Sequence, residues 1–183
     1  MSNGSLAGGG VGNTERSGDV VTSLDLGCGT VPQNPFSAGD CYGVDIRPSS
    51  NPTMRTADLF VDPIPFDSDS FNYVTAIDFI EHIPRVLWVD GTRFPFVRLM
   101  NEVYRVLKPG GIFLSVTPAF PHAQAWQDPT HVNIITEQTF PEYFCKPDLS
   151  AAMYGFIGNF ELLKQEWNAH KLMTYIRKAK TDA

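Results

Sequence analysis

The sequence predicts an α/β protein built on a doubly wound sheet, and three observations carry this prediction. An apolar, strand-like run at residues 20–26 breaks into two glycines one residue apart, Gly27 and Gly29, as in a βαβ unit that opens onto a ligand. A second apolar run ends at Asp45, where an acidic residue can accept hydrogen bonds from the ribose of an adenosyl group. Strand-like and helix-like segments alternate along the rest of the chain, as they do in this fold class.

The strands follow the apolar runs. We expect five of them near residues 20–26, 41–45, 53–57, 71–77 and 111–117. A closing pair of strands is predicted at residues 160–167 and 172–178. In a doubly wound sheet the carboxyl ends of the strands border one crevice, and this crevice is where we expect a ligand.

The helix before the fifth strand has the clearest pattern. Pro95 suits a first-turn position, apolar residues recur after it at helical spacing, and Pro109 with two following glycines ends the run. A further helix is predicted over residues 136–145.

The first crossover is too short for a long helix. Only eleven residues, 30–40, separate the glycine turn from the second strand, and Pro32 and Pro35 lie among them. A connection of this length holds about one helical turn. The helix N-terminus that binds pyrophosphate in nicotinamide enzymes is therefore missing, which favours an adenosyl cofactor that carries no phosphate.

Length and composition indicate one domain at residues 19–183, preceded by a flexible tail at residues 1–18 that is rich in glycine. A net charge of −6 and a pI of about 5.1 argue against nucleic acid or a membrane as partner. The three cysteines form no CxxC pair, which argues against a disulfide framework and for a cytoplasmic protein. We expect neither a transmembrane helix nor a signal peptide.

Four further segments complete a family pattern. After the glycine turn and Asp45, the chain carries characteristic sequences at residues 57–59, 64–74, 79–83 and 105–111. In this order and spacing they resemble the class I S-adenosylmethionine-dependent methyltransferases, in the branch that acts on small molecules. The resemblance runs from about Val20 to the C-terminus, and it implies a Rossmann-like, seven-stranded and mostly parallel sheet. Here the first crossover is shorter than in the family.

The resemblance also implies the cofactor and its site. The cofactor is expected to be S-adenosylmethionine, with S-adenosylhomocysteine as product. Asp25 and the two glycines would shape its methionine end, Asp45 would bind the ribose, and Asp58 would meet the adenine. The predicted cofactor-binding residues are Asp25, Gly27, Cys28, Gly29, Asp45, Ile46, Asp58, Leu59, Asp78 and Phe79.

Two histidines are the candidates for a catalytic base, because imidazole titrates near neutral pH. His131 is the first choice, since it lies in a segment rich in His, Asp and Pro that follows the fifth strand; His82, after the fourth strand, is the second. His131 could instead cap the helix that follows it. We expect no metal, because the spacing of His122, Asp128 and His131 matches no standard ligand motif.

The aromatic content of the C-terminal half indicates an acceptor with an apolar or ring-bearing body. The residues concerned are Phe120, Trp126, Phe140, Tyr143, Phe144, Tyr154 and Phe156. An insertion at residues 84–94 either borders the acceptor pocket or forms a small separate core around Trp88 and Phe94.

The function expected from these patterns is methyl transfer to a small-molecule acceptor, at a hydroxyl oxygen. Three alternatives remain open: N-methylation of a small molecule, N-methylation of a protein side chain, and a non-catalytic module that binds S-adenosylmethionine.

Overall fold

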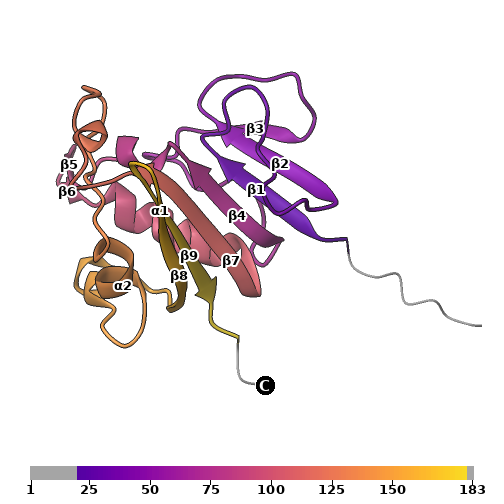
Figure 1. The fold of residues 1–183 in the computed structure, drawn as a ribbon. Helices are drawn as coiled ribbons and strands as arrows, with labels where there is room; N and C mark the ends of the chain where they lie inside the picture. Colours follow the sequence, from indigo (N-terminus) through magenta and orange to yellow (C-terminus); the bar gives the residue numbers. More distant parts are fainter. Residues whose placement is uncertain (1–19, 181–183) are drawn as a thin grey trace, which may run out of the picture.

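The computed structural model describes residues 20–180, so the predicted tail at residues 1–18 lies outside the described range. Seven strands form one sheet in the order β3-β2-β1-β4-β7-β9-β8 (Figure 1). Within this seven-stranded sheet, the pairs β7–β9 and β8–β9 are antiparallel and the other four pairs are parallel. These strands are β1 (Thr22–Leu26), β2 (Asp40–Asp45), β3 (Met54–Thr56), β4 (Phe71–Ile77), β7 (Leu107–Pro118), β8 (Phe160–Asn168) and β9 (Lys171–Lys178). The predicted seven-stranded, mostly parallel sheet is confirmed.

One face of the sheet carries the hydrophobic core. Val74, Phe113 and Ile176 pair in register across β4, β7 and β9. Because paired residues project to the same face of a sheet, these three side chains lie on one face, and all three are fully buried. Both α-helices of residues 20–180, α1 (Pro95–Val106) and α2 (Thr139–Phe144), pack on this face. Phe140 of α2 contacts Phe96 of α1 and Phe113 of the sheet.

Helix α1 begins at the predicted proline and buries the predicted apolar stripe. Its C-terminal neighbour β7 starts at Leu107, earlier than predicted, because Leu107 pairs with Phe71 of β4. Helix α2 is shorter than the predicted 136–145. It begins at Thr139, whose hydroxyl accepts a hydrogen bond from the backbone N–H of Thr136.

The first crossover, residues 27–39, contains turns and bends and no helix. This agrees with the prediction that a connection of this length is too short for a long helix. It packs against the face of the sheet opposite the helices. The ring of Phe36 stacks on Tyr73 of β4 at 4.1 Å between centroids. The backbone N–H of Gln33 donates to the carboxylate of Asp25, which is buried in β1. A buried acid therefore fixes the loop that follows the glycine turn.

The insertion at residues 84–94 folds into a two-stranded sheet, β5 (Leu87–Trp88) and β6 (Thr92–Arg93). Trp88 is 79% exposed, so the predicted alternative of a separate core around it is wrong. Phe94 instead packs against Tyr154. Three short 3₁₀ helices complete the elements: η1 (Ile80–His82), η2 (Ala123–Ala125) and η3 (Ser150–Tyr154). Within residues 20–180 no helix has the length and apolar character that crossing a membrane requires.

Candidate active site

A cleft of about 320 Å³ lies where β1, β2 and β4 end. This is the edge at which a doubly wound sheet binds its ligand. The predicted site residues that line it are Gly27, Asp45, Ile46, Asp58, Leu59, Asp78, Phe79 and His82. Val44, Arg47, Ala57 and Phe60 also line it and were not predicted.

Gly27 forms the floor of the cleft and has a positive φ of 66°. A Cβ atom at this position would lie 2.2 Å from the ring of Phe79, which no side chain tolerates. The turn after β1 therefore requires glycine both for its conformation and for the close approach of this aromatic ring.

Asp45 ends β2, and its buried carboxylate accepts four hydrogen bonds. Two come from backbone N–H groups, of Gly29 at 2.8 Å and of Arg47 at 3.0 Å. The other two come from the side chain of Arg47, from Nε at 2.8 Å and from Nη2 at 3.2 Å. The hydrogen bonds from Arg47 lower the pKa of Asp45, so this group is a carboxylate at neutral pH. The Arg47 side chain is 66% exposed and can leave when a ligand hydroxyl takes its place.

Arg47 is an unpredicted residue of this site that binds Asp45 through both its backbone and its side chain. A basic residue two positions after an acid that ends a strand is a weak sequence signal, because only the turn after β2 brings its side chain back onto the carboxylate.

Three predicted residues lie behind the cleft rather than in its lining. Gly29 acts through its backbone N–H on Asp45. Cys28 is buried against Gly43. A Cβ atom on Gly43 would lie 2.5 Å from the sulfur of Cys28. Asp25 lies below the crossover with Thr75 and Gln33 as hydrogen-bond partners, and burial raises its pKa to about 6. The role predicted for Asp25 at the methionine end would thus be indirect, through the loop that it holds.

Asp58 and Asp78 stand on opposite sides of the cleft lining. The carboxylate of Asp58 accepts a hydrogen bond from the backbone N–H of Phe60 at 3.0 Å, which fixes the turn after β3. Asp78 follows β4 with a positive φ of 50° and pairs with Nζ of Lys171 at 2.5 Å. A left-handed residue other than glycine is a strained conformation of the kind that clusters at functional sites.

The two histidines predicted as alternative bases lie together at the rim of this cleft. The rings of His82 and His131 meet edge to face, with centroids 4.9 Å apart. Their neighbour Glu81 is 1% exposed. Its carboxylate accepts a hydrogen bond from Thr117 at 2.8 Å, and burial raises its pKa.

A hydrogen-bond chain sets the tautomer of His82. The Thr130 hydroxyl lies 2.7 Å from Oδ1 of Asp128 and 3.0 Å from Nδ1 of His82. A carboxylate only accepts, so the single hydroxyl proton goes to Asp128, and the hydroxyl oxygen must then accept from Nδ1–H of His82. In the neutral ring this leaves the lone pair on Nε2.

The segment that carries His131 is clamped onto η1. The backbone N–H groups of Val132 and Asn133 both donate to the carbonyl of Glu81 at 2.9 Å. The buried Asn133 side chain donates to the carbonyl of Ile80 at 3.0 Å and accepts from Nε of Arg85 at 2.6 Å. No side chain caps the N-terminus of α2, and Nδ1 of His131 has no hydrogen-bond partner among residues 20–180, so the predicted alternative in which His131 caps this helix is wrong.

The comparisons with known proteins agree with this architecture. The family described as "Methyltransferase domain" matches residues 11–150. The chain belongs to this family. It is an S-adenosylmethionine-dependent methyltransferase of class I, and S-adenosylmethionine is its cofactor. A search among curated proteins found no match.

Solved structures share the fold of this methyltransferase at low sequence identity. An S-adenosylmethionine-dependent methyltransferase from Mesorhizobium loti is 17% identical over 87% of this chain and 91% of its own, with a TM-score of 0.56. A methyltransferase of Bacillus halodurans, described as putative, is 13% identical over 87% and 93%, with the same TM-score of 0.56. A third, from Haloferax volcanii, is in complex with the Trm112 methyltransferase activator and is 16% identical over 87% and 83%, with a TM-score of 0.57.

The cleft fits an adenosyl cofactor. Its volume is within the range of small-molecule sites, near the lower end. The carboxylate of Asp45, at the end of β2, is deprotonated and is fixed by the backbone N–H groups of Gly29 and Arg47. A fixed carboxylate at the end of the second strand is the group that suits the ribose hydroxyls of an adenosyl cofactor.

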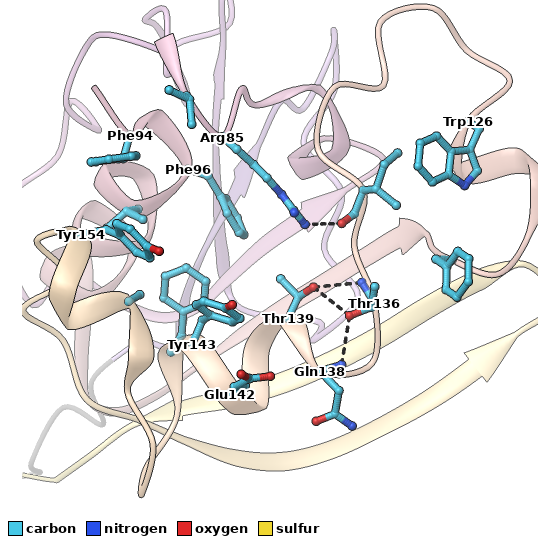
Figure 2. Close-up of a pocket in the computed structure, with 16 residues that line it drawn as sticks. Arg85, Phe94, Phe96, Trp126, Thr136, Gln138, Thr139, Glu142, Tyr143 and Tyr154 are labelled. Atoms are coloured by element: carbon cyan, nitrogen blue, oxygen red, sulfur yellow. Dashed lines mark hydrogen bonds between the residues drawn. The ribbon is translucent and has the colours of Figure 1, made fainter. Parts of the chain in front are cut away.

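A second and larger cavity, of about 690 Å³, lies between α1, α2 and the loop after β7 (Figure 2). Aromatic side chains from several elements line it, and Arg85 reaches into it between them. Of the aromatic residues noted in the sequence, five line this cavity: Phe120, Trp126, Tyr143, Phe144 and Tyr154. The other two, Phe140 and Phe156, belong to the hydrophobic core.

Proposed function

We propose that this methyltransferase transfers the methyl group to a hydroxyl oxygen of a small-molecule acceptor. The observation that carries the proposal is the convergence of His82 and His131, whose ring centroids lie 4.9 Å apart. His82 lines the cofactor cleft, and the segment that bears His131 continues into Ile134, which lines the aromatic cavity. A hydroxyl acceptor needs a base within hydrogen-bond reach of its proton, whereas an acceptor that is already nucleophilic does not.

The residues of the chain divide the work of this reaction. Bound S-adenosylmethionine supplies an activated methyl group for in-line displacement. Asp45 holds the ribose once the ribose hydroxyls replace the exposed side chain of Arg47, and Gly27 leaves room for the ring of Phe79, which lines the cleft. The imidazole lone pair takes the hydroxyl proton, and the resulting oxygen is held close to the methyl group, where positioning supplies much of the rate.

For His82 the accepting atom is Nε2, since the chain through Thr130 to Asp128 keeps Nδ1 protonated. His131, whose ring meets that of His82 edge to face, is the other candidate acceptor of this proton. Both residues therefore remain candidates for the base, and the experiment below separates them.

The aromatic cavity supports a small, ring-bearing acceptor. Its rings come from the 84–94 insertion, α1, α2 and the loop after β7, and they offer flat apolar surfaces for stacking (Figure 2). Arg85 adds one cation to the walls of this cavity. Its guanidinium is held in place by hydrogen bonds to the side chain of Asn133 and to the backbone carbonyl of Ile134. The cavity is the size of a small-molecule site rather than a macromolecular interface.

The test measures formation of S-adenosylhomocysteine with a panel of phenols, sugars and amines. We expect turnover with hydroxyl compounds, and His131→Ala or His82→Ala should lower it by the ~10²–10⁴ typical of a lost general base, with cofactor affinity retained. The matched control is His122→Ala, since His122 packs against Trp167 outside both cavities.

Turnover confined to amines would contradict the hydroxyl acceptor. If both single variants methylate a hydroxyl compound at the wild-type rate, neither imidazole is the base. Binding of S-adenosylmethionine without turnover of any compound would favour the non-catalytic alternative.

A further inference from the structure

We infer that Glu81, His82 and His131 form a binding site for a divalent transition-metal ion such as Zn²⁺. One ligand atom from each of the three side chains lies within 4.8 Å of the other two. Glu81 and His82 are consecutive in η1, while His131 comes from the loop after β7. Sequence spacing predicted no metal, because these ligands come together only through the clamp between that loop and η1.

Two of the three side chains carry buried polar atoms that lack a partner among residues 20–180. These atoms are Oε1 of Glu81 and Nδ1 of His131. Glu81 is 1% exposed, and a buried polar atom without a hydrogen bond is costly. A cation between them would satisfy both atoms.

The surroundings orient the ligands as metal sites require. Metal-binding histidines usually donate their other N–H to a hydrogen-bonded group, which fixes ring and tautomer. His82 has this arrangement through Thr130 and Asp128, which leaves the lone pair of Nε2 for the ion. Oε2 of Glu81 is held by the Thr117 hydroxyl at 2.8 Å, so Oε1 is the atom free to bind.

The donor set selects the class of ion. Two imidazoles and one carboxylate are the ligands of catalytic zinc sites, which keep a further position open, whereas Mg²⁺ prefers oxygen ligands alone. Ligand atoms about 2.1 Å from one ion are roughly 3.4 Å apart in a tetrahedron. Side-chain rotations that bring these atoms about an ångström closer together would therefore complete the site, beside the cofactor cleft that His82 lines.

The metal-binding site itself does not depend on the proposed function, but the effect of a bound ion on methyl transfer does. An ion on these nitrogens occupies the lone pairs proposed to accept the hydroxyl proton. It would replace the free base by lowering the pKa of a hydroxyl that it binds, and the proton would pass to solvent.

The test titrates metal-free protein with Co²⁺, followed by its visible absorption, and with Zn²⁺, followed by calorimetry. We expect one equivalent to bind and Mg²⁺ to bind far more weakly. Glu81→Gln, which keeps the shape of the side chain, and His131→Ala should each weaken Zn²⁺ binding at least tenfold, and His122→Ala should not. Thermal melts confirm that each variant is folded. Absence of Co²⁺ and Zn²⁺ binding, or binding that is unchanged in folded Glu81→Gln and His131→Ala, would overturn the inference.

Methyl transfer measured in chelator and with added Zn²⁺ separates the two proposals. Activity in chelator together with Zn²⁺ binding that the variants weaken supports both. Activity that requires the ion supports the metal site and contradicts a free imidazole base. Activity in chelator with no metal binding overturns the metal site alone.

Discussion

The buried carboxyl of Asp25 should make the stability of the protein depend on pH in a defined direction. Burial raises its pKa from 3.8 to about 6, against the opposing effect of hydrogen bonds from Gln33 and Thr75. At about 1.4 kcal/mol for each tenfold change in proton affinity, this difference corresponds to about 3 kcal/mol. Because the folded state binds the proton more tightly, this stabilisation is complete below pH 3.8 and is lost as the pH rises through 6.

The assay is urea denaturation of the wild type and of Asp25→Asn at pH 4.5 and 7.5. The variant cannot titrate at this position, so subtraction removes the contributions of all other groups. We expect the wild type, relative to the variant, to gain roughly 2 kcal/mol in unfolding free energy at pH 4.5 compared with pH 7.5. A constant difference at the two pH values would refute the reasoning.

Glu102 supplies a control of opposite sign. Burial opposes ionisation of this group, but the hydrogen bond and charge of Arg105 prevail and lower its pKa. Its stabilisation is therefore present above pH 4.5 and lost at lower pH. The wild type should lose stability relative to Glu102→Gln when the pH is lowered from 7.5 to below 4.5.

Three further predictions concern the cofactor cleft. Asp45→Ala should weaken S-adenosylhomocysteine binding tenfold or more, because charge-assisted hydrogen bonds contribute roughly 1.5–3 kcal/mol each. The control variant Arg47→Ala should bind this ligand at least as tightly as the wild type. An unchanged affinity of the Asp45 variant in a binding titration would contradict the ribose assignment. S-adenosylhomocysteine should raise the melting temperature and NAD should not, since no helix follows the glycine turn to bind pyrophosphate; the reverse pattern would refute the choice of cofactor. Gly27→Ala should lower both stability and cofactor affinity, because the added Cβ collides with Phe79 at 2.2 Å, and a variant with wild-type affinity would show that this contact is dispensable.

The sequence alone predicted the sheet because its signals are local. Apolar runs, the turn at Gly27 and the proline at the start of α1 each depend on neighbouring residues, and all lie where expected. The strand-end position of Asp45 is equally local, since it follows from where β2 stops. Element ends were less predictable. Leu107 continues the helical spacing of α1 in the sequence, but its pairing with Phe71 makes it the first residue of β7.

Only the tertiary structure decided which side chains share a site. His82 and His131 were alternatives in the sequence because nothing local relates residues on different loops. The clamp of Asn133 on η1 brings their rings to 4.9 Å and adds the buried Glu81. The same holds for Asp25, which follows the family pattern but lies beneath the crossover. Local spacing fixes backbone conformation, whereas contact, burial and the resulting pKa depend on segments that only folding brings together.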